Sequence, residues 1–396
     1  MRLAYVTSHP IQYQAPVFRA LAAAPDVDFK AFFAWDFGVQ ERVDPNFGRS
    51  VKWDVPLLSG YEHEFVPNLA RDPGAHHFFG LVNPSIALSL RRFRPDAVIV
   101  HGYAHVTELV AILASSLSGV PVLIRGDSNL LGHRRALVRF TKALGAAFLR
   151  TQLAGALAIG TLNREYWRYY GIPEARIFHA PYCVDNAFFQ ADPDKTRARA
   201  AAWRNELGIA PATRVVGYTG KLYDVKDLRT LVEAFGRAHT PDSALVLVGD
   251  GPLRGALEAQ ATRFPDAQIK FAGFVNQSDM PAAYAMLDVF AMTSTSDAWG
   301  LSVNEAMCLG LPIIVSDQVG CGVDLVKADN GWTFAARDVA GLTAILGDVL
   351  RAPAESLAAR GAASRARIAD WSIERSAQAT IDAARVVART PSRRAA

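Results

Sequence analysis

Short apolar runs recur along the whole chain, and longer amphipathic stretches separate them. They include residues 3–6, 97–100 and 120–124 in the first half, and 245–248 and 313–315 in the second. Most of these runs are continuous, which is typical of strands that are buried on both faces. Regular alternation of such strands with helices predicts an α/β fold built on parallel sheets.

The length of 396 residues predicts two domains, because single cores rarely grow to this size. The strand–helix pattern pauses at 186–213 and then starts again. We therefore expect a doubly wound domain at 1–185, a linker with one helix at 186–213, and a second such domain at 214–370, with a cleft between the domains. Residues 371–388 are predicted to form a last helix, and this helix can pack against the first domain.

The composition indicates a globular chain and not a disordered one, with 51% hydrophobic and 20% charged residues. A net charge of +4 is too small to indicate nucleic acid, but it suits an anionic substrate such as a nucleotide sugar, or an anionic membrane surface. The chain has 3 cysteines, which predicts no disulfide framework and fits a cytoplasmic protein. No apolar stretch reaches the roughly 20 residues of a membrane span.

In open parallel sheets, ligands bind beyond the carboxyl ends of the strands, so the loops after the strands are the candidate sites. After the strand at 215–218, Gly220 opens a loop that carries Lys221 and Lys226. Two ammonium groups at a strand end can stabilise a departing pyrophosphate. Spacing alone leaves the alternative that both lysines are solvated.

Two further loops are weaker signals. Gly249 and Gly251 follow the strand at 245–248, where glycine lets the backbone approach a ligand, or where the chain simply turns into a helix. Phe274 and Val275 follow the run at 269–271 and can form an apolar rim for a nucleobase, or an edge of the core.

The segment from Asp297 to Glu305 is the strongest candidate. It follows the strand at 287–292 and opens a helix, so two carboxylates flank a helix start. The amides of Gly300, Leu301 and Ser302 are then donors without intrahelical partners, which suits phosphate oxygens, while the carboxylates can accept hydrogen bonds from sugar hydroxyls. The alternative is a helix cap followed by a solvated acid.

These four segments, in this order, resemble the group 1, glycogen-synthase-like retaining glycosyltransferases, which have two Rossmann-like domains facing across a cleft (the GT-B fold). The resemblance is clearest over 215–331 and weaker elsewhere. It implies that the second domain binds the nucleotide sugar and that the first lies on the acceptor side.

The resemblance also implies roles for single residues. Lys221 and Lys226 match the family's diphosphate-binding basic residues, although Arg is more common at the first position. Glu305 matches the acid that holds the ribose. Asp297 matches the acid that holds the donor sugar, where the family has Glu. Trp299 and Gly300 keep the aromatic residue and the second glycine of the family's Gly-aromatic-Gly motif.

In the first half, the resemblance implies that His101, at the end of the run 98–100, faces the donor sugar. A histidine packed at a strand end is the alternative from the residues alone. Asp127 follows the next strand and can orient an acceptor hydroxyl, or it is a turn residue. His9 and Gln12, in the loop after the first strand, are further acceptor-side candidates, or the start of a helix.

The predicted function is therefore transfer of a sugar from a nucleoside diphosphate sugar to a hydroxyl acceptor, with His101, Asp297, Lys226 and Lys221 as catalytic residues, in polysaccharide, glycolipid or natural-product glycoside synthesis. The family implies retention of configuration, no cofactor and no obligatory metal. A sugar-nucleotide epimerase and a non-catalytic binding subunit are the alternatives. The basic residues Arg125, Arg134, Arg135, Arg139, Lys142 and Arg150 suit a lipid-linked acceptor and peripheral contact with an anionic inner membrane face, or a solvated helix.

Overall fold

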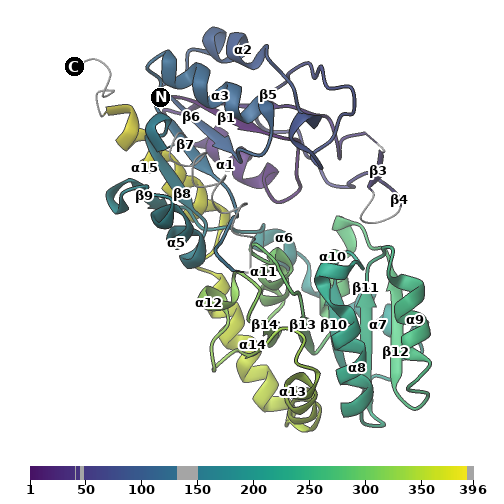
Figure 1. Cartoon of the computed structure of the whole chain (residues 1–396). Helices are drawn as coiled ribbons and strands as arrows, with labels where there is room; N and C mark the ends of the chain where they lie inside the picture. The colour runs from purple at the N-terminus through teal and green to yellow at the C-terminus, as the bar shows by residue number, and fades with distance from the viewer. Residues whose placement is uncertain (41, 45–48, 132–149, 390–396) are drawn as a thin grey trace. The chain divides into compact units, whose positions relative to one another are not determined.

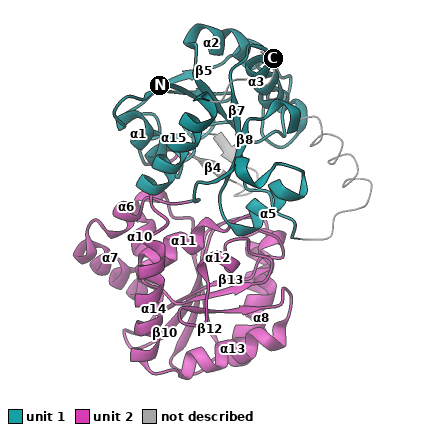
Figure 2. Ribbon diagram, turned by 90° about the vertical axis from the view of Figure 1, so that its left-hand side faces the viewer, with its two compact units in different colours: residues 1–42, 55–182, 373–396 teal, residues 43–54, 183–372 magenta. Residues whose placement is uncertain are grey.

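The structure is a computed structural model that describes residues 1–40, 42–44, 49–131 and 150–389 (Figure 1). The chain forms two compact units, coloured separately in Figure 2. Unit 1 contains Met1–Arg42, Val55–Tyr182 and Ile373–Ala396, and unit 2 contains Val43–Asp54 and Cys183–Ser372. The last helix of the chain is therefore part of unit 1, although unit 2 precedes it in the sequence.

Unit 1 is built on a seven-stranded parallel sheet with the order β5-β2-β1-β6-β7-β8-β9. The strand order reverses between β1 and β6, which makes this point the topological switch of the sheet. The strands are β1 (Arg2–Thr7), β2 (Asp28–Phe33), β5 (Glu62–Phe65), β6 (Ala97–His101), β7 (Val122–Arg125), β8 (Gly155–Ala158) and β9 (Ile177–His179).

Helices cover both faces of this sheet, which explains why its strands are continuously apolar. Alternate residues of β1 point to opposite faces. Ala4 and Val6 pack with α2 (Ile86–Phe93), α3 (Val106–Leu117) and α5 (Thr161–Tyr169). Leu3 and Tyr5 pack with α1 (Ala15–Ala23) and α15 (Ile373–Arg389). The carboxyl-terminal helix is thus an integral part of the core of unit 1.

Unit 2 repeats this plan with a six-stranded parallel sheet in the order β12-β11-β10-β13-β14-β15. Its switch point lies between β10 and β13. The strands are β10 (Arg214–Thr219), β11 (Ser243–Val248), β12 (Gln268–Gly273), β13 (Val289–Met292), β14 (Ile313–Ser316) and β15 (Gly331–Phe334).

The helices of unit 2 also cover both faces of its sheet. One face packs with α8 (Leu228–Ala238), α9 (Arg254–Ala261) and α13 (Val339–Arg351). The helices α10 (Met280–Ala285) and α11 (Leu301–Cys308) contact β10, β13 and β14, and α7 (Pro193–Glu206) and α14 (Ala354–Ile368) pack against them. The prediction of two doubly wound α/β units is confirmed.

The remaining elements are short. They are α6 (Asn186–Gln190), α12 (Gly322–Leu325), the strand pair β3 (Arg42–Asp44) and β4 (Arg49–Val51), and the 3-10 helices η1 (Phe78–Gly80), η2 (Glu174–Arg176), η3 (Asp224–Lys226) and η4 (Gln277–Asp279). The stretch 186–213 holds two helices and not the one expected, because Asp192 caps a new helix that starts at Pro193. Within the described part of the chain, no helix has the length and apolar character needed to cross a bilayer.

The packing of α15 generates a stability prediction. Ala384 is fully buried between this helix and the sheet, whereas Ala388 on the same helix is exposed. The substitution Ala384→Asp buries a carboxylate without a partner and should lower the free energy of unfolding by about 3 kcal/mol or more. The matched control Ala388→Asp should change it by less than about 0.5 kcal/mol. Urea denaturation followed by circular dichroism measures both, and equal effects of the two variants would contradict this packing.

Candidate functional site

The strand order of unit 2 brings two predicted loops together. β10 and β13 are neighbours, so the loop after β10, with Lys221 and Lys226, and the loop after β13, with Asp297, leave the same edge of the sheet. The two loops are also hydrogen bonded to one another. Thr293 Oγ1 donates to the carbonyl oxygen of Lys226 at 2.8 Å, and the Thr295 amide donates to that of Val225 at 2.8 Å. The position of Lys226 is thus set by the neighbouring strand.

Lys226 and Asp297 form an ion pair at this edge, in which Nζ of the lysine donates to Oδ2 of the aspartate. Both side chains are only 15% exposed, so solvent screens the pair less than it would at the surface. The other carboxylate oxygen, Oδ1, accepts a hydrogen bond from the Trp299 amide at 3.1 Å. Sequence analysis predicted both residues as donor-binding groups, but it did not predict that they pair with each other.

The backbone around Asp297 is held by the loop that follows β14. The Asp297 amide donates to the carbonyl oxygen of Gln318 at 3.0 Å, and the Gly320 amide donates to that of Asp297 at 3.0 Å. Trp299 is 3% exposed, its Nε1 donates to Asn304 Oδ1 at 2.9 Å, and its ring centroid lies 5.0 Å from that of Trp371. The Trp299 side chain is therefore packed inside unit 2, and its role in donor binding stays a prediction.

Gly300 starts helix α11 in a backbone conformation that requires glycine. Its φ is +95°, and a Cβ atom would lie 2.8 Å from Val319 Cγ1. Leu301 and Ser302 follow in the first turn and are half-buried. The first amides of a helix have no intrahelical partner and carry the positive end of the helix dipole, so this turn offers donors to an anion.

Glu305 lies one turn further along α11, in a different environment from Asp297. Its Oε2 accepts a hydrogen bond from the Tyr284 hydroxyl at 2.6 Å, and Tyr284 in turn accepts one from Thr219 Oγ1 at 2.5 Å. Burial raises the pKa of Glu305 to about 7, although the hydrogen bonds from Tyr284 and Gln277 oppose this shift. The two acids of the segment therefore differ: one is paired with a cation, and the other titrates near neutrality.

Sequence analysis missed Tyr284, Thr219 and Gln277, which surround Glu305. Tyr284 is fully buried within α10, and Thr219 is the last residue of β10. In the sequence, both belong to segments that are otherwise apolar, where a single hydroxyl gives no signal. Only the packing of α10 beside α11 reveals them.

The glycines at the ends of β10 and β11 allow two loops to pack on one another. A Cβ atom on Gly249 would lie 1.8 Å from the carbonyl oxygen of Gly220, and one on Gly251 would lie 2.5 Å from that of Leu222. The Leu222 amide donates to the carbonyl oxygen of Asp250 at 2.9 Å. These predicted donor-binding glycines shape the loop that carries Lys221, whose carbonyl oxygen accepts a hydrogen bond from the Tyr218 hydroxyl at 3.1 Å.

Phe274 and Val275 follow β12 and are both half-buried. The next residues are fixed by the segment Val43–Asp54, which belongs to the same unit. Asn276 Nδ2 donates to the Lys52 carbonyl oxygen at 2.9 Å, and the Ser278 amide donates to Asp54 Oδ1 at 3.0 Å. These two hydrogen bonds fix the residues on either side of Gln277, which is itself a hydrogen-bond partner of Glu305.

In unit 1, His101 ends strand β6 at the switch point. Its Nδ1 lies 2.8 Å from the Tyr5 hydroxyl and 3.2 Å from Gln14 Nε2. Burial, and then the charges of Arg125 and His9, lower the pKa of His101 to about 3, so the imidazole is neutral at physiological pH. A neutral histidine of this kind can donate or accept a hydrogen bond, but it does not act as an imidazolium acid.

The other acceptor-side candidates lie in the neighbouring loops of unit 1. His9 Nδ1 is 2.9 Å from Ser8 Oγ, and its ring packs edge-on against Trp35 and Phe37. Gln12 is half-buried, and Asp127 is exposed directly after β7. Of the basic residues predicted to form a surface, Arg134, Arg135, Arg139 and Lys142 lie outside the described residues, whereas Arg125 is buried in the sheet.

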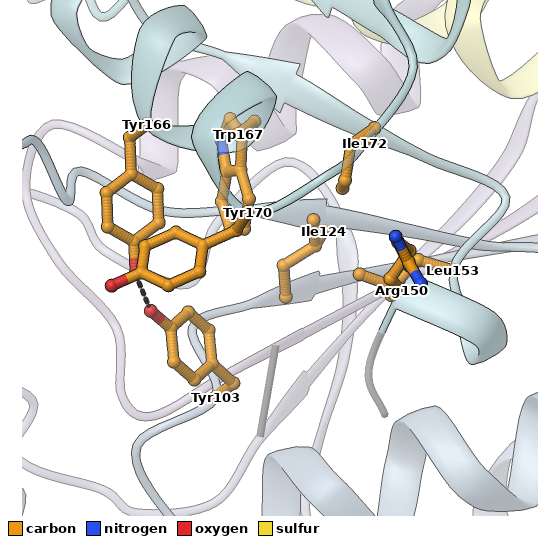
Figure 3. Close-up of a pocket in the computed structure, with 8 residues that line it drawn as sticks. All are labelled: Tyr103, Ile124, Arg150, Leu153, Tyr166, Trp167, Tyr170 and Ile172. Atoms are coloured by element: carbon orange, nitrogen blue, oxygen red, sulfur yellow. Dashed lines mark hydrogen bonds between the residues drawn. The ribbon is translucent and has the colours of Figure 1, made fainter. Parts of the chain in front are cut away.

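A small apolar pocket in unit 1 lies apart from the predicted binding residues. Figure 3 shows the aromatic rings of Tyr103, Tyr166, Trp167 and Tyr170 around it, with Arg150 at one end. The hydroxyls of Tyr103 and Tyr166 are hydrogen bonded to each other. The lining is almost entirely apolar, so the pocket lacks the convergent polar groups that would orient a sugar or a phosphate.

Metal-binding side chains gather elsewhere in unit 1. Within the described ranges, one group of three such residues was found, namely Asp72, His76 and His77. The Nε2 atoms of His76 and His77 lie 3.2 and 3.3 Å from Asp72 Oδ2, distances that also fit ordinary exposed ion pairs. None of these residues belongs to the predicted site.

Comparison with known proteins identifies relatives of this chain. Residues 200–367 match the family described as "Glycosyl transferases group 1". The GDP-mannose-dependent alpha-(1-6)-phosphatidylinositol monomannoside mannosyltransferase of Mycolicibacterium smegmatis is 32% identical over 203 residues, which are 49% of this chain and 52% of the relative. The chain thus spans about half the length of this relative. The 2-deoxystreptamine glucosyltransferase of Streptomyces kanamyceticus is 28% identical over 279 residues, 68% of this chain and 71% of the relative.

The fold extends over nearly the whole chain. The crystal structure of Anabaena Alr3699/HepE in complex with UDP and glucose superposes with a TM-score of 0.73 and 19% identity, covering 96% of this chain and 98% of that one. The sucrose-phosphate synthase of Thermosynechococcus elongatus also has a TM-score of 0.73, with 17% identity and 98% of both chains covered. At this level of identity, the likeness concerns the fold.

The environment of Glu305 predicts a pH dependence of stability. Its pKa is about 7 in the folded protein against 4.5 for the ordinary value, so the folded state binds more protons between these two pH values. Its contribution to stability is complete below pH 4.5 and is lost as the pH rises through about 7. Glu305→Gln has no group that titrates at this position. Between pH 4.5 and about 7, its free energy of unfolding should therefore fall by roughly 1–3 kcal/mol less than that of the wild type.

Urea midpoints measured from pH 4.5 to 8 test this prediction. Glu355→Gln is the matched control, because Glu355 is exposed on α14 and should leave the curve unchanged. Parallel curves for wild type and Glu305→Gln would contradict the assignment.

Proposed function

Because residues 200–367 belong to the group 1 glycosyl transferase family, we propose that this chain transfers a sugar from a nucleoside diphosphate sugar to a hydroxyl acceptor. We further propose that the transfer retains the configuration of the sugar and needs no metal ion or cofactor. The observation that carries the proposal is the half-buried edge of the second sheet, which carries the Lys226–Asp297 pair and the start of α11 with Glu305.

Each group at this edge suits one part of the donor. Lys226, Lys221 and the first amides of α11 supply positive charge and hydrogen-bond donors for the diphosphate. Asp297 orients the donor sugar, and its ion pair with Lys226 supports this role, since the sugar and the diphosphate of the donor are themselves neighbours. Glu305 accepts hydrogen bonds from the ribose hydroxyls as the carboxylate. Phe274 and Val275 form the apolar rim for the base.

The proposed reaction exchanges one carbon–oxygen bond for another. The acceptor hydroxyl oxygen bonds to the anomeric carbon while the bond from that carbon to the diphosphate oxygen breaks. The hydroxyl proton passes to an oxygen of the departing phosphate on the same face of the sugar. Lys226, Lys221 and the α11 amides stabilise the negative charge that develops on the diphosphate, which is the main catalytic contribution of this site.

Unit 1 is proposed to contribute the acceptor side. His101 is a hydrogen-bonding partner of the substrate, and His9, Gln12 and Asp127 are the candidate contacts of the acceptor. The mannosyltransferase relative uses GDP-mannose, and the Anabaena structure contains UDP and glucose. Because these two proteins differ in both the base and the sugar, experiment must identify the donor of this chain.

A donor screen tests the proposed function directly. Thermal unfolding is measured with UDP-, GDP- and ADP-sugars, since a donor that fits stabilises the folded state by mass action. The stabilising donor is then incubated with and without a panel of hydroxyl acceptors. Release of nucleoside diphosphate together with an acceptor glycoside supports glycosyl transfer. An isomerised sugar formed without an acceptor would instead establish an epimerase, and binding without turnover a non-catalytic subunit.

The acceptor is proposed to be lipid-linked, as in the phosphatidylinositol monomannoside mannosyltransferase, with peripheral contact to an anionic membrane. The support is the basic sequence that includes Arg134, Arg135, Arg139, Lys142 and Arg150, whereas Arg125 is buried in the sheet and is no part of such a surface. We expect the protein to float with anionic vesicles at low ionic strength and to be released by salt, because such contacts are electrostatic. Neutral vesicles are the control. Absence of binding to anionic vesicles at low ionic strength would remove this part of the proposal.

The ion pair predicts the phenotype of one substitution. Lys226→Ala removes a cation from the diphosphate site and leaves Asp297 without its partner, so kcat/KM should fall by roughly 100- to 1,000-fold. Steady-state assays with the donor identified above measure the change. Lys195→Ala, at an exposed position on α7, is the control and should retain wild-type activity. A wild-type rate for Lys226→Ala would exclude the proposed role of this lysine.

A further inference from the structure

We propose that Gln14 and Tyr5 are positioning residues that hold His101 as the neutral tautomer with its proton on Nε2, so that this histidine donates a hydrogen bond to a substrate hydroxyl. The inference rests on the proposed function, because it concerns a residue that is proposed to bind the substrate of the transfer reaction. It extends that function by assigning roles to two residues, neither of which the sequence analysis had marked as functional.

The geometry places both residues on the same nitrogen of His101. Tyr5 lies on β1, next to β6 in the sheet, and its hydroxyl is 2.8 Å from Nδ1. Gln14 is the N-cap residue of α1, where its backbone is fixed by a hydrogen bond from its amide to the Ile11 carbonyl oxygen at 3.0 Å. Its Nε2 is 3.2 Å from Nδ1. Gln14 is 4% exposed and Tyr5 3%, so water competes little with these contacts.

The tyrosine decides which nitrogen of the imidazole carries the proton. Burial raises the pKa of Tyr5 well above its ordinary value, so the phenol keeps its proton. Among the described residues, Nδ1 of His101 is the only acceptor recorded for that proton. Nδ1 therefore accepts, and the imidazole proton resides on Nε2.

The orientation of the Gln14 amide follows from the same argument. An Nδ1 lone pair would repel the amide oxygen, so the NH₂ group faces the histidine and Oε1 faces elsewhere. Oε1 is buried and accepts no hydrogen bond from any residue in the described part of the chain, and the same holds for Gln12 Oε1 and Thr7 Oγ1. A buried acceptor without a donor is costly, by roughly 1–3 kcal/mol in proteins. A polyhydroxy ligand offers the donors that these oxygens lack.

The surroundings keep His101 from charging. Arg125 on β7 and His9 in the loop after β1 are the groups whose charges disfavour the imidazolium, and Tyr5 and Gln14 fill the Nδ1 side. Within the described residues, no carboxylate is recorded against the ring to oppose them. His101 therefore donates its hydrogen bond throughout the physiological pH range, and the acceptor proton leaves by the phosphate route proposed above.

Nitrogen-15 NMR of histidine-labelled protein tests the tautomer without any assay of activity. In the wild type, we expect the His101 signals of a proton on Nε2 and a bare Nδ1, unchanged from pH 5 to 9. His101→Gln identifies these signals. A protonated Nδ1, or titration near pH 6.5, would overturn the inference.

Two substitutions test the positioning roles. Gln14→Glu replaces the donor by a carboxylate acceptor, which should move the proton to Nδ1, make His101 titrate, and lower kcat by roughly 10- to 100-fold with a new pH dependence. Tyr5→Phe removes only the hydroxyl. It should give a mixture of the two His101 tautomers and a smaller fall in kcat than Gln14→Glu. Gln378→Met, at an exposed position of α15 in the same unit, is the control for the glutamine substitution.

The outcomes separate this inference from the proposed function. If Gln14→Glu and Tyr5→Phe keep the wild-type tautomer and kcat, the positioning roles are wrong while glycosyl transfer stands. If the wild type turns over no donor, the proposed function falls, and the NMR spectra still decide the state of His101. Gln14→Met, which has nearly the shape of glutamine, supplies the test if Gln14→Glu does not fold: it leaves Tyr5 as the one remaining partner of Nδ1 among the described residues, so a fraction of the Nδ1 tautomer should appear and kcat should fall, and an unchanged tautomer and kcat would overturn the role of Gln14.

Discussion

All neighbouring strands in the two large sheets are parallel, and both sheets are covered by helices on both faces. Parallel strands require a crossover between each pair, so every loop that leaves a carboxyl end emerges at the same edge. In unit 2 the order reverses between β10 and β13, and the loops on either side of that reversal carry Lys226 and Asp297. Residues separated by 71 positions in the sequence thereby become an ion pair. The site is a consequence of this topology.

The two acids at the start of α11 show how one segment obtains two kinds of carboxyl group. Asp297 is paired with the Lys226 ammonium group through Oδ2 and accepts a hydrogen bond from the Trp299 amide through Oδ1. Glu305 is half-buried beside a tyrosine, with no cation recorded against it among the described residues, which favours the neutral form. An acid paired with a lysine and a titrating acid further along the helix suit different parts of one ligand.

Unit 1 uses the same topology with different chemistry. At its switch point, the imidazole of His101 is neutral and is surrounded by a tyrosine and an amide. The sheet that presents it depends on α15, which comes from the far end of the sequence and completes the core against α1. The carboxyl-terminal helix therefore supports, through the sheet, a residue more than two hundred positions before it.

The sequence by itself determined the fold class, because the apolar runs and amphipathic stretches allow little besides covered parallel sheets. It also marked Lys226, Asp297, Glu305 and His101 as candidate site residues, because each lies at a strand end or a helix start and matches a position of the family that the chain resembles. It could not determine their partners. The pairing of Lys226 with Asp297, and the contacts of Tyr284 with Glu305 and of Gln14 with His101, join segments far apart in the chain. Only the tertiary structure decided these contacts and the burial that sets the pKa values of Glu305 and His101, because a protonation state depends on the three-dimensional surroundings of a group and not on its neighbours in sequence.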